Sequence, residues 1–209
     1  MNSMIRRTAE VLFPDLLFGL DIKEHQVLLT FDDGPHPAST LFILSLLEEY
    51  RARAIFFCLG KNAEQYPTLF SRITEKGHLI GNHSYSHLNG WKTGTTRYCE
   101  NVEKGQKILG STLFRPPYGK LTPMQYFILR RKYRIALWTH LVRDYDLGMQ
   151  PRHELKRLLN KVKPGAIMTF HDSEKAVKNL QQFLPSALKA ITDKGFQFAL
   201  PEQINQSQL

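Results

Sequence analysis

Short β-type runs alternate with longer segments of helical periodicity along most of this 209-residue chain, and this alternation limits the possible folds more than any other feature. Residues 27–31 read as a strand, and the apolar spacing over 39–50 is typical of a helix. Repeated βα units of this kind form a parallel sheet covered by helices. Further strands are expected at 54–58, 79–80, 113–114, 135–138, 166–170 and 196–198. Further helices are expected at 67–77, 98–109, 122–132, 151–162 and 180–191.

About seven βα-like units predict an α/β fold whose parallel strands curl into a barrel, with an open doubly wound sheet as the alternative. The chain contains no Ser/Gly/Pro-rich linker, no low-complexity tract and no long block of like charge, so residues 1–209 are expected to form a single domain. In both architectures the functional side chains lie at the carboxyl ends of the strands.

The composition is that of a packed globular domain, because 42% of the residues are apolar and 22% are charged. Lys and Arg number 28 against 19 Asp and Glu, and the net charge of +9 would attract polyanions such as nucleic acid, acidic glycans or an anionic membrane face. The two cysteines, Cys58 and Cys99, have no CxxC spacing, which favours two buried free thiols over one disulfide.

The N-terminal residues contain no uninterrupted signal-peptide core, because Pro14 and Asp15 break the apolar stretch there. No apolar run in the chain is long enough to span a bilayer. These features favour a cytoplasmic protein without a transmembrane segment.

Two motifs carry the residue types of a metal site. The sequence Asp-Asp-Gly-Pro at 32–35 follows the first strand, and in an extended chain its two carboxylates would point in different directions, one toward a metal and one toward a proton. His83 and His87 follow the strand at 79–80, and their i, i+4 spacing predicts one face of a helical turn capped by Asn82. Two histidines and one carboxylate leave coordination positions open, as catalytic zinc-type sites require. Taken singly, the motifs also fit a solvated turn and a pair of metal-free surface histidines.

Three more groups follow predicted strands. Arg115 begins the sequence Arg-Pro-Pro-Tyr-Gly, a stiff loop that suits an arginine paired with a carboxylate and an N–H that faces a ligand. Asp144 lies beyond the strand at 135–138, and His171 ends the apolar strand at 166–170 as an ionisable group. Because parallel strands share one carboxyl edge, seven side chains are expected at one rim: Asp32, Asp33, His83, His87, Arg115, Asp144 and His171.

With these motifs the chain resembles the polysaccharide deacetylase family, the NodB homology domain of carbohydrate esterase family 4. The resemblance extends over a core from about Val27 to Phe198 through five motifs in the family's order. It implies a single-domain, distorted (β/α)7-type barrel that hydrolyses the N-acetyl group of amino sugars. The motifs are Thr30-Phe31-Asp32-Asp33-Gly34, His83-Ser84-Tyr85-Ser86-His87, Arg115-Pro116-Pro117-Tyr118-Gly119, Asp144-Tyr145 and Thr169-Phe170-His171.

The resemblance also implies a role for each matching residue. One divalent ion, zinc in the first place with cobalt, nickel or iron as alternatives, would be bound by Asp33, His83 and His87. Asp32 would be the general base, and Arg115 would hold it in place. His171 would be the general acid, and Asp144 would tune its pKa.

The substrate side of the site departs from the family pattern. The backbone N–H of Tyr118 would help to bind the oxyanion. Thr169 stands where family members often carry a leucine in the acetyl pocket, Tyr145 stands in place of a frequent tryptophan, and Leu141 replaces an upstream aspartate. The shape of the pocket, and so the preferred substrate, stays open. Its expected lining residues are Pro116, Pro117, Tyr145 and Thr169.

The leading hypothesis is a metal-dependent hydrolase that removes acetyl groups from an N-acetylglucosamine-containing glycan such as peptidoglycan or a chitin-like oligosaccharide. An acidic glycan would suit the net charge of +9. A catalytically silent glycan-binding module on the same barrel is the alternative. No aromatic-rich RNA motif, zinc finger or basic recognition helix is present, so no specific nucleic-acid partner is expected, and a monomer is favoured over an oligomer. Family relatives often work at the cell envelope, which leaves the compartment open.

Overall fold

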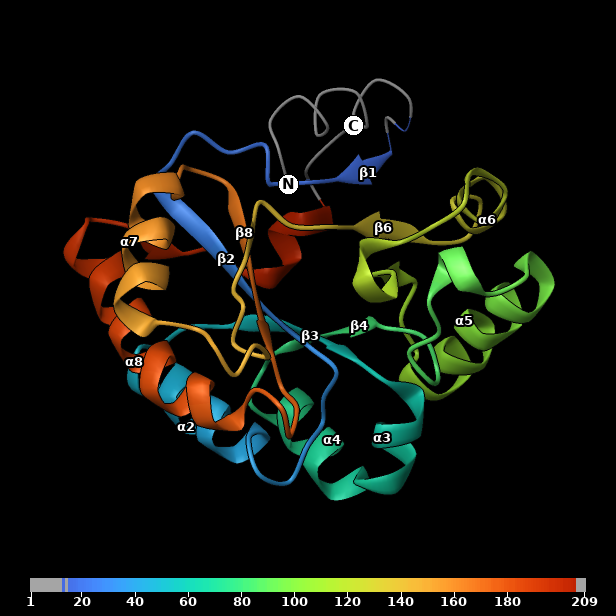
Figure 1. Ribbon diagram of the computed structural model, residues 1–209, viewed down its shortest axis with the longest axis horizontal. Coiled ribbons are helices and arrows are strands. Elements are labelled where there is room, and N and C mark those ends of the chain that lie inside the picture. Colours follow the sequence, from blue (N-terminus) through green and yellow to red (C-terminus); the bar gives the residue numbers. More distant parts are fainter. Residues whose placement is uncertain (1–12, 14, 206–209) are drawn as a thin grey trace.

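The computed structural model describes residues 13 and 15–205, which form one α/β domain (Figure 1). Its strands are β1 (Leu16–Leu17), β2 (Gln26–Asp32), β3 (Ala54–Cys58), β4 (Leu79–Asn82), β5 (Leu113–Phe114), β6 (Arg134–Ala136), β7 (His140–Leu141), β8 (Ala166–His171) and β9 (Gln197–Phe198). Its α-helices are α2 (Thr40–Glu49), α3 (Gly60–Gln65), α4 (Pro67–Glu75), α5 (Thr95–Leu109), α6 (Pro123–Leu129), α7 (Pro151–Lys161) and α8 (Val177–Asp193). Short 3₁₀ turns are η1 (Gly90–Lys92), η2 (Pro117–Gly119) and η3 (Pro201–Asn205).

The strands lie in the order β1-β6-β5-β4-β3-β2-β8-β7, every pair is parallel, and β9 pairs with the start of β2. The chain after β6 crosses between the two ends of this sheet. Leu137 N–H donates to Leu17 O at 2.7 Å, and Thr139 N–H donates to Ile167 O at 3.0 Å. The sheet is thus curled on itself, and the predicted distorted (β/α)7-type barrel with parallel strands is confirmed.

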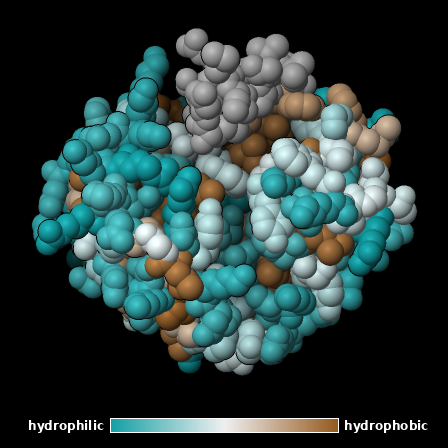
Figure 2. Space-filling model, in the orientation of Figure 1, coloured by the Kyte–Doolittle hydropathy of each residue, from teal (hydrophilic) through white to brown (hydrophobic). Residues whose placement is uncertain are grey.

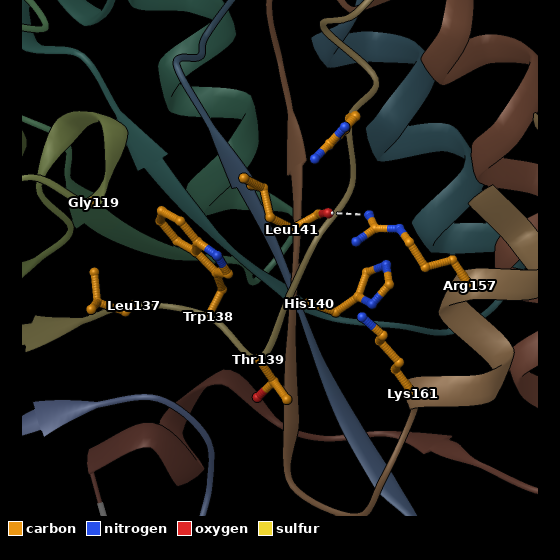
Figure 3. Close-up of a pocket in the computed structure, with 9 residues that line it drawn as sticks. Gly119, Leu137, Trp138, Thr139, His140, Leu141, Arg157 and Lys161 are labelled. Carbon is orange, nitrogen blue, oxygen red and sulfur yellow. Dashed lines mark hydrogen bonds between the residues drawn. The ribbon is translucent and has the colours of Figure 1, made fainter. Parts of the chain in front are cut away.

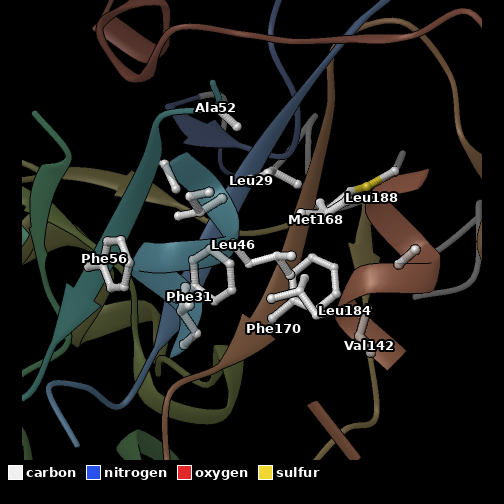
Figure 4. Close-up of a cluster of buried hydrophobic side chains, with 14 of the residues drawn as sticks. Leu29, Phe31, Leu46, Ala52, Phe56, Val142, Met168, Phe170, Leu184 and Leu188 are labelled. Atoms are coloured by element: carbon white, nitrogen blue, oxygen red, sulfur yellow. The ribbon is translucent and has the colours of Figure 1, made fainter. Parts of the chain in front are cut away.

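The alternation of side chains along the strands separates a helix-covered core from the inside of the barrel. Phe31 on β2 stacks between Phe56 and Phe170 (Figure 4). Its ring centroid lies 5.1 Å from that of Phe56 and 5.5 Å from that of Phe170. Each such buried ring stabilises the fold by roughly 1.5–3 kcal/mol. Because successive residues of a strand point to opposite faces, Thr30 and Asp32 lie on the inner face of the sheet. The packing of phenylalanines on one face therefore orients the polar residues on the other.

Several short elements differ from the predicted ones. The two-residue strands β1 and β7 and the six-residue helix α3 were not expected, because elements of this length show no clear periodicity. The strand predicted at 135–138 ends at Ala136, so Trp138 lies in the crossing segment. Residues outside 27–198 also enter the core, since Leu17 and Ile204 are buried.

Both cysteines are free, as predicted, but only Cys58 is buried and Cys99 is partly exposed. Among the described helices, none is both long and apolar enough to cross a membrane.

Candidate active site

The seven rim residues do converge, and the strand register explains how. In the pairing of β2 with β8, Asp32 lies opposite His171. In the pairing of β3 with β4, Cys58 lies opposite Asn82, so His83 begins its loop at the same edge. The loops after β5 and β7 bring Arg115 and Asp144 into direct contact with this group through the hydrogen bonds described below. All seven therefore lie at the carboxyl rim.

Asp33, His83 and His87 form a cluster, called the cradle below, whose geometry could hold a metal ion. Each offers one ligand atom, and these atoms all lie within 4.8 Å of one another. Asp33 Oδ1 is 3.7 Å from His83 Nε2 and 3.2 Å from His87 Nε2, close to the separation of about 3.3 Å between two ligands of one tetrahedral zinc ion. Asp33 Oδ1 is buried and has no hydrogen-bond partner among the described residues. A buried oxygen without a partner, facing two imidazole nitrogens, fits a divalent ion of the zinc type.

The orientation of the His83 ring is set by a hydrogen bond on the side away from Asp33. Its Nδ1–H donates to the backbone oxygen of Arg115 at 2.7 Å, which leaves Nε2 with its lone pair directed at Asp33. Burial, followed by the nearby His87, lowers the pKa of His83 to about 3. Burial also lowers the pKa of His87. Both imidazoles are therefore neutral at pH 7, the state in which histidine binds a metal.

The segment between the two histidines is a loop, so the predicted helical turn is wrong. Ser84 and His87 have φ values of 69° and 58°, outside the right-handed helical region. Asn82 does not cap a helix: its side-chain oxygen accepts from Ser84 N–H at 2.8 Å, and its amide donates to Val102 O on α5 at 2.9 Å. Asn82 is thus the residue that folds this loop and ties it to α5.

The two adjacent carboxylates diverge, although the chain is not extended at the second one. Asp33 has a φ of 79°, and its backbone is held by Asn62, whose amide donates to Asp33 O at 2.8 Å. Asp32 turns instead toward Arg115. Asp33 therefore faces the two imidazoles and Asp32 faces Arg115, while the division into a metal-binding and a proton-handling carboxylate stays a prediction.

Arg115 is completely buried, and it binds Asp32 while its other contacts fix the guanidinium in place. Its Nη1 donates to Asp32 Oδ1 at 2.6 Å and to Thr30 Oγ1 at 2.8 Å, and its Nη2 donates to Leu137 O at 2.9 Å. The guanidinium lies 3.9 Å above the ring of Phe57. A buried charge is tolerated when it is paired and hydrogen-bonded in this way, and the arrangement fixes one oxygen of Asp32 while leaving the other available.

His171 and Asp144 form a second buried pair. His171 Nδ1–H donates to Asp144 Oδ1 at 2.6 Å, and the backbone N–H of His171 donates to Oδ2 at 2.8 Å. Burial lowers the pKa of His171, but the charge of Asp144 and this hydrogen bond raise it more, and the resulting pKa is about 9. His171 is therefore a protonated imidazolium at neutral pH, with Nε2–H free to donate.

Two tyrosines lie at the edges of the site. The ring of Tyr118 contacts His87 at 4.5 Å, and the ring of Tyr145 contacts His171 at 4.8 Å, both edge-on. Both rings are largely exposed. Pro116 precedes η2 and Pro117 is its first residue, and Tyr118 within η2 takes a φ of 60°. Each tyrosine thus covers the edge of a different histidine of the site.

Comparison with known proteins places this geometry in a family. A family model described as polysaccharide deacetylase matches residues 20–130. A peptidoglycan-N-acetylglucosamine deacetylase of Bacillus cereus is 31% identical over 195 residues, which cover 87% of this chain and 69% of that protein. This chain belongs to the polysaccharide deacetylase family. The resemblance predicted from the motifs is confirmed.

Other members of the polysaccharide deacetylase family agree with this assignment. A chitooligosaccharide deacetylase of Azorhizobium caulinodans is 30% identical over 159 residues, covering 71% of this chain and 74% of that one. A crystal structure of a peptidoglycan N-acetylglucosamine deacetylase in complex with 4-naphthalen-1-yl-N-oxidanyl-benzamide has a TM-score of 0.87 and 28% identity, covering 96% of this chain and 97% of the other. The fold is therefore shared almost from end to end.

Within this deacetylase fold, Thr169 lies deeper than its predicted place in the pocket suggests. It is fully buried, and its hydroxyl lies 3.0 Å from that of Thr30. Since Thr30 donates to Met168 O at 2.9 Å, Thr169 is the donor between the two. The hydroxyl of Thr169 is therefore engaged by Thr30, and whether its methyl group lines the acetyl pocket stays a prediction.

One buried carboxylate that supports the site was not predicted from the sequence. Asp172 is fully buried, and it accepts from Ser39 Oγ at 2.6 Å and from Thr40 Oγ1 at 2.7 Å. Burial raises its pKa to about 7. A Cβ on Gly34 would come within 2.2 Å of this carboxylate, so Asp172 holds the loop after Asp33 against the start of α2. Its position next to His171 was the available signal.

Proposed function

We propose that this member of the polysaccharide deacetylase family is a metal-dependent hydrolase that removes N-acetyl groups from an N-acetylglucosamine-containing glycan, either peptidoglycan or a chitin-like oligosaccharide. The main support for this proposal is the register of β2 and β8. It puts Asp32 beside His171 at the edge of the Asp33, His83 and His87 cradle. Relatives named as peptidoglycan and chitooligosaccharide deacetylases support this substrate class.

The proposed reaction adds water to the amide and breaks the C–N bond. A divalent ion, zinc in the first place, would supply Lewis-acid polarisation of the carbonyl and lower the pKa of water at the site. Asp32, held by Arg115, accepts a proton from the attacking water. His171, kept charged by Asp144, donates its Nε2 proton to the leaving nitrogen. The products are acetate and a free amine, so the reaction requires Asp32 to act as a proton acceptor and His171 as a proton donor.

The remaining proposed roles concern the substrate. The backbone N–H of Tyr118 is assigned to the developing negative charge on the carbonyl oxygen, where one such donor contributes roughly 3–4 kcal/mol in other hydrolases. Pro116, Pro117 and Tyr145 are assigned to the wall around the acetamido group. The support for these roles is the stiff loop over 116–119 and the contact of Tyr145 with His171.

Acetate release from chitooligosaccharide and from peptidoglycan fragments, with and without chelator and after reloading with Zn²⁺, tests the proposal. We expect activity that disappears with chelator and returns with metal. Asp32→Asn should retain the metal and reduce kcat by about 10²–10⁴-fold, whereas Asp193→Asn, an exposed carboxylate on α8, is the matched control. Release that ignores the chelator would contradict the metal role. Glycan binding without any acetate release would favour the silent binding module.

A further inference from the structure

A pocket of about 290 Å³ opens at the seam where the chain crosses from β6 to β7 (Figure 3). Trp138 stands on one side of it, and His140, Arg157 and Lys161 stand on the other. The proposed function makes no use of this pocket. Its lining combines one large aromatic ring with cationic side chains, a combination that suits a ligand with both an apolar face and a negative charge.

The pocket has a surplus of positive charge. Arg143, Arg157 and Lys161 line it, and none of its described lining residues carries a carboxylate. Arg157 is paired with Glu154, its Nε donating to Oε2 at 2.9 Å. Arg143 and Lys161 form no ion pair with any carboxylate of residues 13 and 15–205. Two cations are thus left for a ligand, on the side of the molecule around α7 that is mainly hydrophilic (Figure 2).

The wall behind these cations is rigid. Glu154 is buried, lies 3.3 Å from His140 Nε2, and is held by Arg157 as well. Arg157 Nη2 in turn donates to Leu141 O at 2.6 Å. Burial lowers the pKa of His140, so its ring is neutral and Glu154 is not also paired with an imidazolium. The pocket is therefore formed before a ligand arrives.

Two residues that line the pocket are next in sequence to residues of the rim. Gly119, which lines the pocket, directly follows Tyr118, and a Cβ at Gly119 would meet the indole of Trp138 at 2.7 Å. Arg143 directly precedes Asp144, the partner of His171. The pocket therefore borders two of the segments that carry rim residues, which places it within reach of a further sugar of a glycan whose acetamido group is at the rim.

We propose that the pocket binds a carboxylate-bearing substituent of the glycan, with Arg143 and Lys161 as its charge partners and Trp138 against the attached sugar. This inference rests on the proposed function and names its substrate class: an acidic amino-sugar polymer. Peptidoglycan strands without stem peptides carry such a carboxylate on the lactyl ether of every second sugar, and chitin-like chains carry none.

Two tetrasaccharides with the same β-1,4 backbone serve as probes, namely chitotetraose and the peptide-free peptidoglycan tetrasaccharide with its lactyl carboxylates. The measured quantity is the ratio of kcat/KM for the acidic over the neutral probe. Calorimetric binding of the same two probes gives the corresponding ratio of Kd values without turnover.

The informative variant is Arg143→Gln/Lys161→Gln, and its control is Arg152→Gln/Lys156→Gln, which removes the same charge from exposed positions of α7 outside the pocket. We expect the acidic preference to fall at least tenfold in the pocket variant, because the loss of even one charge-assisted hydrogen bond has about this effect. In the control variant the preference should persist.

The possible outcomes separate the two proposals. Turnover of both probes without an acidic preference, or an equal loss of preference in both double variants, overturns the pocket assignment and leaves the deacetylase function standing. No turnover of either probe, combined with tighter acidic binding that only the pocket variant loses, supports the pocket and overturns the function.

Discussion

The hydroxyl of Thr30 uses its full hydrogen-bonding capacity, donating to Met168 O and accepting from Arg115 and Thr169. Thr30→Val keeps the side-chain shape but leaves one N–H of the buried guanidinium without an acceptor. We expect it to lower the free energy of unfolding by about 1–3 kcal/mol and to lower kcat through misplacement of Asp32. Thr169→Val, the matched control, keeps the contact of Thr30 with Arg115 and should cost about 1 kcal/mol. Urea denaturation and acetate assays measure both, and equal losses would contradict this ranking.

The charge state of His171 is a second property of a single residue. Its pKa of about 9 lies above the ordinary 6.5, so the pair with Asp144 stabilises the fold fully below pH 6.5, and this contribution is lost as pH rises through about 9. If His171 is the general acid, kcat should fall over the same alkaline range.

In Asp144→Asn the largest charge that raises the pKa of His171 is removed, while burial still lowers this pKa and the charges of Asp33 and Asp32 still raise it, so the alkaline limb of the pH–kcat profile should move from about 9 to lower pH. NMR titration of the His171 ring should show the same shift. Asp146→Asn, which alters an exposed carboxylate two residues away, is the control. A common alkaline limb in the two variants would exclude His171 as the titrating acid.

At the scale of elements, the helix α5 supports the histidine loop through a glycine. A Cβ at Gly105 would lie 2.7 Å from Asn82 Oδ1 and 2.8 Å from the backbone of Ser84. Alanine has a helix propensity about 1 kcal/mol more favourable than that of glycine. The substitution therefore stabilises α5 locally while it displaces the loop between His83 and His87. We expect Gly105→Ala to weaken Zn²⁺ affinity at least tenfold with helix content unchanged.

Gly94→Ala is the control for this substitution, because no atom lies within 4 Å of the added Cβ at the start of the same helix. Competition with a chromophoric chelator measures the affinity, and circular dichroism measures the helix content. Equal affinities in the two variants would show that α5 does not position the loop.

The same loop shows where prediction from sequence ends. The i, i+4 spacing of His83 and His87 fits a helical turn, and it equally fits a loop in which Ser84 and His87 have positive φ. What selects the loop is Asn82, whose partner Val102 lies 20 residues away. The two-residue strand β7 escaped prediction for a similar reason, because its pairing with β8 is decided by register rather than by any local pattern.

For the whole molecule, the sequence predicts the residues at the rim of the site better than the buried hydrogen bonds that hold them in place. Apolar runs mark the strands, parallel strands share one carboxyl edge, and polar residues directly after the runs therefore meet there. The contact between Thr30 and Thr169 spans 139 positions and depends on the register of β2 against β8, which no local pattern encodes. The same is true of Asp172, which holds Ser39 and Thr40 from the far end of the chain.

Metal binding should also stabilise the whole domain, because the cradle joins the loop after β2 to the loop after β4. A ligand at 100 times its Kd stabilises the folded state by about 2.7 kcal/mol, which corresponds to roughly 5–11 °C in Tm for a chain of this size. We expect Zn²⁺ to raise the Tm of the chelator-treated protein by this amount and Mg²⁺ to leave it nearly unchanged, since imidazole ligands favour zinc.

His87→Ala should remove this increase, whereas His153→Ala, an exposed histidine on α7, should retain it. Differential scanning calorimetry at pH 7 is the measurement, and it does not depend on turnover. An equal increase in both variants would place the bound ion elsewhere, because a cradle that joins two loops stabilises the fold only while all three of its ligands are present.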